Sequence, residues 1–428
     1  MSYRLSLILA ALAMAVPASA WDGSPIEPID LPPSIEQGVD MIYIDDELAP
    51  PRFRGGNAAR QAGFDISGGA AIDLFEPVHP LYIELRRGLV RYQMRWADLP
   101  QVMIPTGPAL RLGSDDERVA LLRERLGLPA GTRFDEATDK AVREYQEAHG
   151  LKVDGIAGAR MIESLNLGYD HYERILTINL ERTRRLPLPD ERSRYVLVDV
   201  GAARLWLYEN GKPVDSMRVI VGAKETATPM MAANLRFVSV NPYWNVPPEL
   251  AQTLVAPRVL AEGMSYLTDR KYDVLSDWTD DATIVDPRTV DWRAVASGKT
   301  EIRLRRAPGP GNSMGDIKFM MPNDFGIYLH DTPDKALFAK DDRWISNGCV
   351  RVEDAQRLAR WLFGYVPKGR TRTVEENVDL PEPVPVYMTY LTAGVTAKGV
   401  QFRSDPYGKD QALLARYSAP KGNIAAIR

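Results

Sequence analysis

Hydrophobic and polar positions alternate with period two through most of the chain after about residue 193. The alternation predicts strands at residues 195–200 and 204–209, the turn pair Asn210-Gly211, and a returning strand at residues 214–221. Further strands are predicted at residues 235–240, 302–304, 317–320, 325–329, 384–391 and 400–403. This half of the chain is therefore expected to form a β-rich domain.

Between residues 112 and 168 the apolar positions instead recur at helical spacing, which predicts a small three-helix module. Ser114 is the expected N-cap of the first helix and Asp135 that of the second, which Gly150 ends. The three apolar stripes are Val119, Leu122 and Leu126; Ala137, Ala141 and Tyr145; and Met161, Ile162 and Leu165.

Residues about 247–300 interrupt the strand pattern with helical stretches such as 249–260. An insertion of this length is more often a lid or subdomain than an unstructured loop. Residues 21–111 have no assignable role, since their first part is proline-rich and residues 81–87 fit a helix or a strand equally. Residues 413–428 are polar and are expected to form a C-terminal tail.

The first twenty residues have the features of a secretory signal peptide. Arg4 precedes an apolar run at residues 5–16, and Ala18-Ser19-Ala20 supplies small residues for cleavage. A retained membrane anchor is the alternative, but the run is short and no later segment approaches the ~20 apolar residues of a span. The mature protein is therefore expected to be soluble and exported.

Composition and charge limit the number of domains, the kinds of partner and the kinds of site that this chain can have. A chain of 428 residues suits two or three domains, and its 45% hydrophobic and 26% charged residues are ordinary for globular proteins. The net charge of −4 gives no reason to expect a nucleic-acid partner. One cysteine excludes an internal disulfide and a cysteine-based metal site. Because unpaired thiols are at risk in exported proteins, this one is expected to have a use.

The cysteine, Cys349, lies in Ser-Asn-Gly-Cys-Val-Arg, and His330 lies upstream in Tyr-Leu-His-Asp-Thr-Pro. A thiol with a pKa near ~8.5 needs a base such as an imidazole to become a nucleophile. Asn347-Gly348 suits a left-handed turn whose N–H groups could form an oxyanion hole. A helix over residues 353–362 is expected to follow, and its N-terminal dipole would favour a thiolate.

Several side chains keep two interpretations at this stage. Arg351, two residues after Cys349, either clamps a substrate carboxylate or forms a surface salt bridge with Glu353 or Asp354. Cys349 itself could be a buried core residue. His149 and His171 are interpreted as structural, and His79 has no partner that the sequence identifies.

The two motifs around His330 and Cys349 resemble the signature of the L,D-transpeptidase (YkuD-type) catalytic domain. Several further stretches agree with its long Gram-negative branch, and the resemblance covers residues about 193–412. These stretches are Val221-Gly222, Thr228-Pro229, Asn241 through Pro247, Pro308 through Asn312, Lys318-Phe319, Tyr390-Leu391 and Asp405 through Gly408. Residues 112–168 resemble the three-helix peptidoglycan-binding domain, through Phe134-Asp135, Tyr145-Gln146, His149-Gly150-Leu151, Val153-Asp154-Gly155, Gly158 and Leu165-Asn166.

The resemblance implies an α+β multidomain fold, with a β-rich catalytic domain, a helical lid insertion and the small three-helix module before it. It makes Cys349 the nucleophile and His330 the proton donor and acceptor, oriented by the backbone carbonyl of Asp331. Asn347, Gly348 and Arg351 are the implied oxyanion and substrate-binding residues. Many relatives have histidine where Asn347 stands, so a direct role for that side chain is in doubt. No metal or other cofactor is implied.

The implied reaction joins two peptidoglycan tetrapeptide stems, donor and acceptor, by a 3–3 cross-link through a thioester, with release of D-alanine. It implies a periplasmic location at the cell wall, association with other wall-synthesis enzymes, and covalent inhibition by carbapenems. Within this chemistry, water as acceptor gives an L,D-carboxypeptidase or a hydrolase of wall-anchored lipoproteins, and free D-amino acids give exchange. A non-catalytic wall-binding protein and an ordinary cysteine peptidase are the alternatives from other classes.

Overall fold

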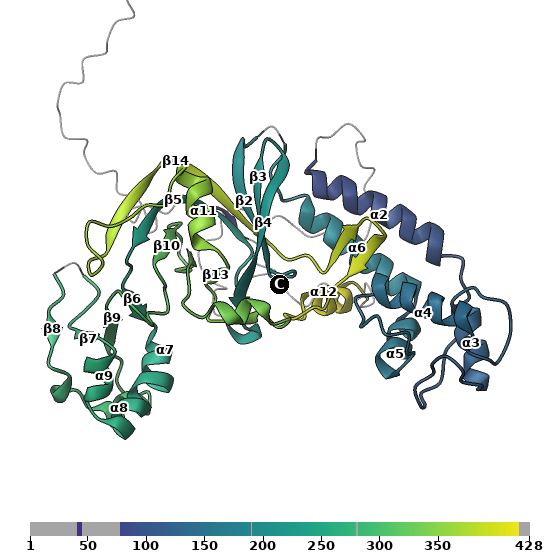
Figure 1. Ribbon diagram of the computed structural model, residues 1–428, viewed down its shortest axis with the longest axis horizontal. Helices are drawn as coiled ribbons and strands as arrows, with labels where there is room; N and C mark the ends of the chain where they lie inside the picture. The colour runs from purple at the N-terminus through teal and green to yellow at the C-terminus, as the bar shows by residue number, and fades with distance from the viewer. Residues whose placement is uncertain (1–40, 45–77, 190, 280, 419–428) are drawn as a thin grey trace, which may run out of the picture.

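The computed structural model describes residues 41–44, 78–189, 191–279 and 281–418, which form three parts side by side (Figure 1). A β-rich part lies in the centre, an insertion with its own sheet lies on one side, and a group of helices lies on the other. The expected signal peptide, residues 21–40 and the last ten residues of the expected tail lie outside the described residues.

The central sheet closes on itself. Its strands follow the order β1-β5-β10-β11-β13-β4-β3-β2-β14, and β14 pairs back with β5; β12 adds to β4. Only β1 and β12 lie off this closed path. The strands are β1 (Met41–Ile44), β2 (Arg194–Asp199), β3 (Arg204–Glu209), β4 (Lys212–Gly222), β5 (Met231–Val240), β10 (Ile317–Met320), β11 (Leu329–His330), β12 (Trp344–Ser346), β13 (Val350–Val352) and β14 (Glu376–Thr389).

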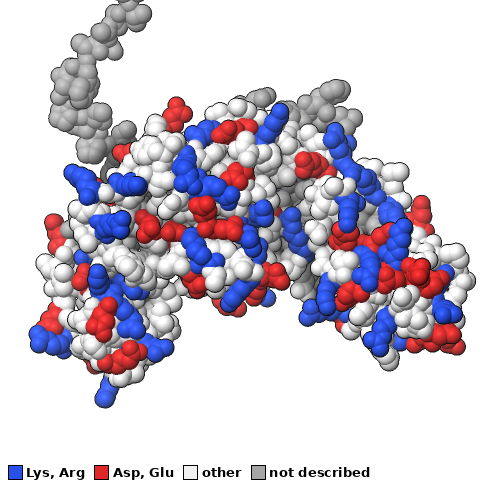
Figure 2. Space-filling view, in the orientation of Figure 1, with Lys and Arg blue, Asp and Glu red and all other residues white. Residues whose placement is uncertain are grey.

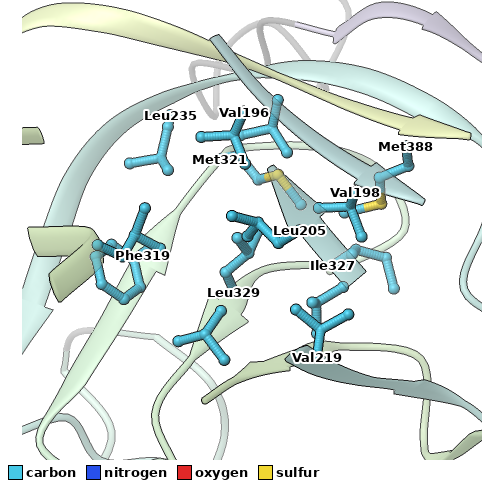
Figure 3. Close-up of a cluster of buried hydrophobic side chains, with 14 of the residues drawn as sticks. Val196, Val198, Leu205, Val219, Leu235, Phe319, Met321, Ile327, Leu329 and Met388 are labelled. Carbon is cyan, nitrogen blue, oxygen red and sulfur yellow. The ribbon is translucent and has the colours of Figure 1, made fainter. Parts of the chain in front are cut away.

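Side-chain alternation separates the inside of this closed sheet from its outside. Val196 and Val198 of β2 belong to the main core, whereas Tyr195 and Leu197 between them belong to a second, outer cluster. Figure 3 shows the inner cluster, in which Phe319 and other side chains from separate strands converge. Burying one such aliphatic or aromatic side chain contributes about 1.5–3 kcal/mol. The helix α11 (Ala355–Phe363) adds four buried residues to the same core.

The inner positions also fix which residues lie outside. Leu329 of β11 pairs with Val350 of β13, and both are fully buried in the main core. Their neighbours His330 and Arg351, which pair with each other, must therefore point to the outer face. The outer face of β11 and β13 is where the predicted chemistry lies.

The insertion begins earlier and ends later than the sequence predicts. Helices make up much of it, as expected, and a four-stranded sheet that the sequence analysis did not predict joins them, in the order β6-β9-β7-β8. Its core is separate from the main one. The elements are β6 (Trp244–Val246), α7 (Pro248–Leu250), a π-helical turn (Ala251–Val255), α8 (Ala256–Glu262), α9 (Ser265–Asp269), β7 (Tyr272–Leu275), β8 (Ile284–Val285), α10 (Trp292–Ala296) and β9 (Arg303–Arg306).

The helical part is larger than the predicted module because flanking segments share its core. The undecided segment at residues 81–87 lies in a 17-residue helix, α2. Its side chains pack in one cluster with the module and with residues 393–402 at the far end of the chain. The elements are α2 (Pro80–Trp96), α3 (Glu117–Arg125), α4 (Glu136–Ala148), α5 (Ala159–Leu167), α6 (Tyr169–Thr183), β15 (Ala393–Thr396), β16 (Gly399–Phe402) and α12 (Lys409–Ser418). Helix α12 crosses the expected boundary at residue 413.

Two local predictions were wrong, and a third was confirmed. Asp116, not Ser114, caps α3, because its carboxylate accepts from the N–H of Arg118. The predicted strand at 325–329 is reduced to the two residues of β11, because the side chain of Asn323 bonds four nearby backbone groups and folds the segment into a loop. The helix expected over residues 353–362 is confirmed as α11, and the strand β13 lies between it and Cys349.

His149 and His79 both have buried hydrogen-bond partners. His149 ends α4, with Nδ1 2.9 Å from the carbonyl oxygen of Tyr145 and Nε2 3.1 Å from the hydroxyl of Tyr92, which confirms a structural role. His79 caps α2 and lies 2.7 Å from the hydroxyl of Tyr195, so it has the partner that the sequence could not identify. Among the described residues no helix has the length and apolar character that a membrane crossing requires.

Replacing Leu358 by alanine should reduce the free energy of unfolding by about 2–5 kcal/mol, because this fully buried side chain joins α11 to the main core. Urea unfolding of the whole chain measures this change in the free energy of unfolding. Gln356→Ala on the exposed side of the same helix is the control and should change stability by less than about 0.5 kcal/mol. Equal effects of the two variants would contradict the packing described above.

Candidate active site

Cys349 lies in a tight connection between β12 and β13, and hydrogen bonds fix the backbone on both sides of it. Gly348 has φ +118°, which a side chain would oppose, so glycine is required there. The hydroxyl of Ser346 donates to the carbonyl of Cys349 (2.6 Å) and accepts from the N–H of Gly348 (3.2 Å), and the hydroxyl of Thr228 donates to the carbonyl of Gly348 (2.7 Å).

The same geometry bears on the expected oxyanion hole. The Gly348 N–H is already bonded to Ser346, whereas the N–H of Cys349 has no hydrogen bond within the part of the chain that the structure describes. The Asn347 side chain is exposed. The strand β13 and the cap residue Asp354 lie between the thiol and α11 in the sequence, and the expected dipole contribution of that helix stays a prediction.

The register of three strands assembles the site on the outer face. Lys318 of β10 pairs with His330 of β11, which pairs with Arg351 of β13, so these three form one row across the sheet. The next row along β11 holds Tyr328 beside Cys349, since the N–H of Val350 bonds the carbonyl of Tyr328. Residues close in space here are up to 33 positions apart in sequence.

His330 is held in one tautomer. Its Nδ1 lies 2.5 Å from the carbonyl oxygen of Asp331, and because a carbonyl can only accept, Nδ1 carries the hydrogen. Only 3% of the residue is exposed, and burial, with the positive charges of Arg351, Lys318 and Lys335, lowers the pKa of His330 to about 3. The ring is therefore neutral at pH 7, and Nε2 carries no hydrogen.

The Asp331 carbonyl is itself held firmly. The Asp331 carboxylate accepts hydrogen bonds from the ammonium group of Lys335 (2.6 Å) and from the N–H of Asp316 (3.1 Å). The backbone N–H of Asp331 donates to the carbonyl of Ile317 (2.9 Å). These side chains line a cavity of about 650 Å³ beside the histidine, together with Phe338, Glu353 and the first residues of α11.

Cys349 keeps part of its surface accessible, and its Sγ lies 3.6 Å from the carbonyl oxygen of Gly326. Burial raises the pKa of the Cys349 thiol, while Tyr328, Lys318 and Arg351 act in the opposite direction. The thiol of Cys349 and the imidazole of His330 are therefore both neutral in the resting site, and the hydrogen-bond partner of Sγ is the carbonyl of Gly326. An interior core position for Cys349 is not what the structure shows.

The expected salt bridge of Arg351 is absent from the described residues. Glu353 instead pairs with Arg218 (3.1 Å), and Asp354 caps α11 by accepting from the N–H of Arg357. The Arg351 side chain has no hydrogen bond or ion pair with any described residue, and its Nε is buried without a partner. Arg351 is half-buried, and leaving its Nε without a partner away from water is costly, so this side chain suits an anionic ligand.

Sequence reasoning missed two side chains of this face, Lys318 and Tyr328. The ammonium nitrogen of Lys318 lies 4.2 Å from the centre of the Tyr328 ring, and that ring meets His330 edge-on at 5.7 Å between centres. Tyr328 also packs against the core of the insertion. The signal was present as alternation, since Lys318 lies between the core residues Ile317 and Phe319.

No group of three or more His, Cys, Asp or Glu side chains arranged to hold a metal occurs within the described ranges.

Two family models match the chain. Residues 193–386 match the L,D-transpeptidase catalytic domain (YkuD), and residues 120–165 match a "Putative peptidoglycan binding domain". A Haemophilus influenzae protein described as "Putative L,D-transpeptidase" is 32% identical over 245 residues, which is 56% of this chain and 48% of that protein. The match thus spans about half the length of this curated relative.

Solved structures of L,D-transpeptidases are also similar, but distantly. One from Mycobacterium smegmatis is 11% identical, with 46% of this chain and 58% of that chain covered and a TM-score of 0.23. The L,D-transpeptidase 3 of Mycobacterium tuberculosis is 10% identical over 46% of this chain and 60% of that chain, again with a TM-score of 0.23. These scores carry no argument about the site, and the family assignment rests on the sequence models.

The alkylation rate of Cys349 by iodoacetamide should rise about tenfold per pH unit from pH 6 to pH 9. The reason is that the pKa of the thiol is raised, so the thiolate fraction keeps growing over this range. Intact-mass spectrometry measures the rate, and every adduct reports Cys349 because the chain has one cysteine. A rate already constant between pH 6 and pH 8 would indicate a preformed thiolate–imidazolium pair and contradict the neutral resting site.

Proposed function

Because residues 193–386 belong to the L,D-transpeptidase (YkuD) family, we propose that this chain is a cysteine-dependent L,D-transpeptidase forming 3–3 cross-links in peptidoglycan. The observation that carries the proposal is the row of Lys318, His330 and Arg351 beside a partly exposed Cys349. This row puts a base and two cations on the strands around the thiol.

In the proposed first half-reaction, Nε2 of His330 takes the proton of the Cys349 thiol. The sulfur attacks the carbonyl carbon at the L-centre of the third residue of a tetrapeptide stem, normally meso-diaminopimelate. The imidazolium then gives the proton to the nitrogen of the terminal D-alanine, the C–N bond breaks, and a thioester remains. The carbonyl of Asp331 supports this role, because it keeps the hydrogen on Nδ1 and leaves Nε2 to exchange protons.

In the second half-reaction, the side-chain amine of an acceptor stem attacks the thioester and His330 receives the amine's proton. The C–S bond then breaks, the new amide remains, and His330 returns the proton to the sulfur of Cys349. The free N–H of Cys349 is the best-supported oxyanion donor, because the Gly348 N–H already bonds Ser346. Arg351 would bind a substrate carboxylate. Transfer requires the acceptor to out-compete water, and the insertion is proposed as the lid, since Tyr328 joins its core to the thiol's surroundings.

The match of residues 120–165 supports a role of the helical part in holding the enzyme on peptidoglycan. Export to the periplasm, action at the cell wall and association with other wall-synthesis enzymes are parts of the same proposal. Because the module shares its core with α2 and with residues 393–402, removing residues 112–168 would expose catalytic-side surface. Deletion is therefore a poor test of binding.

Cys349→Ala should abolish cross-linking of purified tetrapeptide stems, by about 1000-fold or more, without loss of the circular dichroism spectrum of the fold. Mass spectrometry of the products measures 3–3 dimers, released D-alanine and tripeptide separately. Undiminished dimer formation by the variant would eliminate Cys349 as nucleophile. Tripeptide without dimer from the unmodified protein would instead assign the L,D-carboxypeptidase reaction.

A carbapenem should acylate the same thiol, because the ring-opening of a β-lactam uses the same attack on a carbonyl carbon. The expected result is a mass increase equal to one carbapenem on the unmodified protein. Cys349→Ala, which otherwise keeps the chain unchanged, should show no increase. An adduct on both proteins would place the reaction elsewhere.

A further inference from the structure

The ammonium group of Lys318 lies on the outer face beside the thiol and has no role in the reaction as proposed so far. Its strand β10 runs next to β11, and its register partner is His330. Arg351 is the partner of His330 on the other side. With neighbouring strands about 4.8 Å apart, the two cations flank the histidine with backbones roughly 10 Å from each other.

Both cations lack an anionic partner within hydrogen-bonding distance. The described residues give the Lys318 ammonium no hydrogen bond and no ion pair; what it contacts is the face of the Tyr328 ring, at 4.2 Å. Glu375 is a carboxylate whose charge acts on Lys318, but its oxygen is engaged by the N–H of Tyr243. Arg351 likewise has no hydrogen bond or ion pair with a described residue, and its Nε is buried without a hydrogen-bond partner.

A partly buried lysine without a counter-ion is destabilising, since desolvation of an ammonium is not offset by a ring face alone. Burial accordingly lowers the pKa of Lys318, and Cys349 and Glu375 act against that. Lys335, which is also near His330, differs in this respect, because it bonds the Asp331 carboxylate and the carbonyl of Glu353. Lys318 is thus arranged to meet a charge that a ligand brings.

The proposed donor stem carries two carboxylates near the bond that is cut. One belongs to the terminal D-alanine, directly beyond the scissile amide, and the other lies at the D-centre, at the far end of the diaminopimelate side chain. Lys318 and Arg351 lie on either side of His330, as the two carboxylates lie on either side of the scissile carbonyl. One cation alone could neutralise only one of them.

We propose that Lys318 is a second carboxylate-binding residue of the donor site, opposite Arg351, and that the enzyme thereby selects stems with both carboxylates free. This inference rests on the proposed function and deepens it. Each cation takes one carboxylate, and Tyr328 keeps the Lys318 ammonium directed over its ring toward the thiol's side of the sheet. The residue determines which donor is used, and His330 remains the acid/base.

The test measures the rate at which Cys349 becomes acylated in a single turnover, so that the acceptor cannot affect the result. Three donors are compared: the native tetrapeptide stem, the stem with its D-centre carboxyl as a carboxamide, and the stem ending in D-alaninamide. The proteins are the unmodified chain, Lys318→Met, Lys318→Arg and, as a matched control, Lys340→Met, which makes the same change at an exposed position.

Lys318→Met should slow acylation by the native stem about 10- to 100-fold. It should slow one of the two amidated stems by a similar factor and leave the other within about threefold of the unmodified protein. The unaffected stem is the one that lacks the carboxylate bound by Lys318, so the pattern identifies that carboxylate. Lys318→Arg should recover much of the native rate, and Lys340→Met should match the unmodified protein.

Two outcomes would overturn the inference. One is equal slowing of all three stems and of alkylation by uncharged iodoacetamide, which would make Lys318 a counter-ion of the thiolate. The other is no change in any rate. If Lys318→Met does not fold, the unmodified protein still decides, because an equal acylation rate for all three stems excludes carboxylate selection. Failure of the unmodified protein to acylate with the native stem would reject the proposed function itself.

Discussion

The alternation of side chains across a closed sheet is the constraint on which the rest of this structure depends. Each strand of the ring buries one set of side chains inside, where Phe319, Leu329 and Val350 fill the core. The alternate side chains of each strand therefore point to the outer face of the sheet. Lys318, His330 and Arg351 lie in one row because their neighbours are apolar and interior. A shift of one residue in any of the three strands would bury a charge and remove the row.

Burial then sets the electrostatics of the site. The histidine is neutral because the cations around it and the loss of solvent both disfavour a second proton, and the carbonyl of Asp331 determines which nitrogen carries the one it has. The thiol is neutral because its surroundings desolvate the thiolate. In the proposed reaction these two groups exchange a proton, and Lys318 and Arg351, which have no ion pair with a described residue, would meet the charge of a substrate.

The peripheral parts relate to this site in different ways. The insertion has its own core, to which Tyr328 of the site belongs, so closing or opening of the insertion would act directly on the surroundings of Cys349. The helical part is joined to the catalytic part through residues 393–402, which pack among its helices. Charges of both signs are mixed over the face shown in Figure 2, without a large region of one sign. The charge of a substrate is thus expected to be recognised by the charged side chains within the site rather than by the surface as a whole.

The sequence by itself determined the class of fold, the longer strands of the main sheet and the helical module, and it singled out Cys349 and His330 as candidates, because alternation, helical spacing and local motifs are properties of neighbouring residues. It also predicted a glycine with positive φ at residue 348, which the structure has. It failed where side chains compete for the backbone, since the Asn323 side chain shortened β11, and it did not predict the strand β13 between the thiol and the expected helix. Only the tertiary structure decided that Arg351 has no partner among the described residues, that Lys318 lies over the Tyr328 ring near Cys349, and that His79 meets Tyr195. These facts depend on which strands become neighbours, and strand order is set by packing over the whole chain rather than by any local pattern.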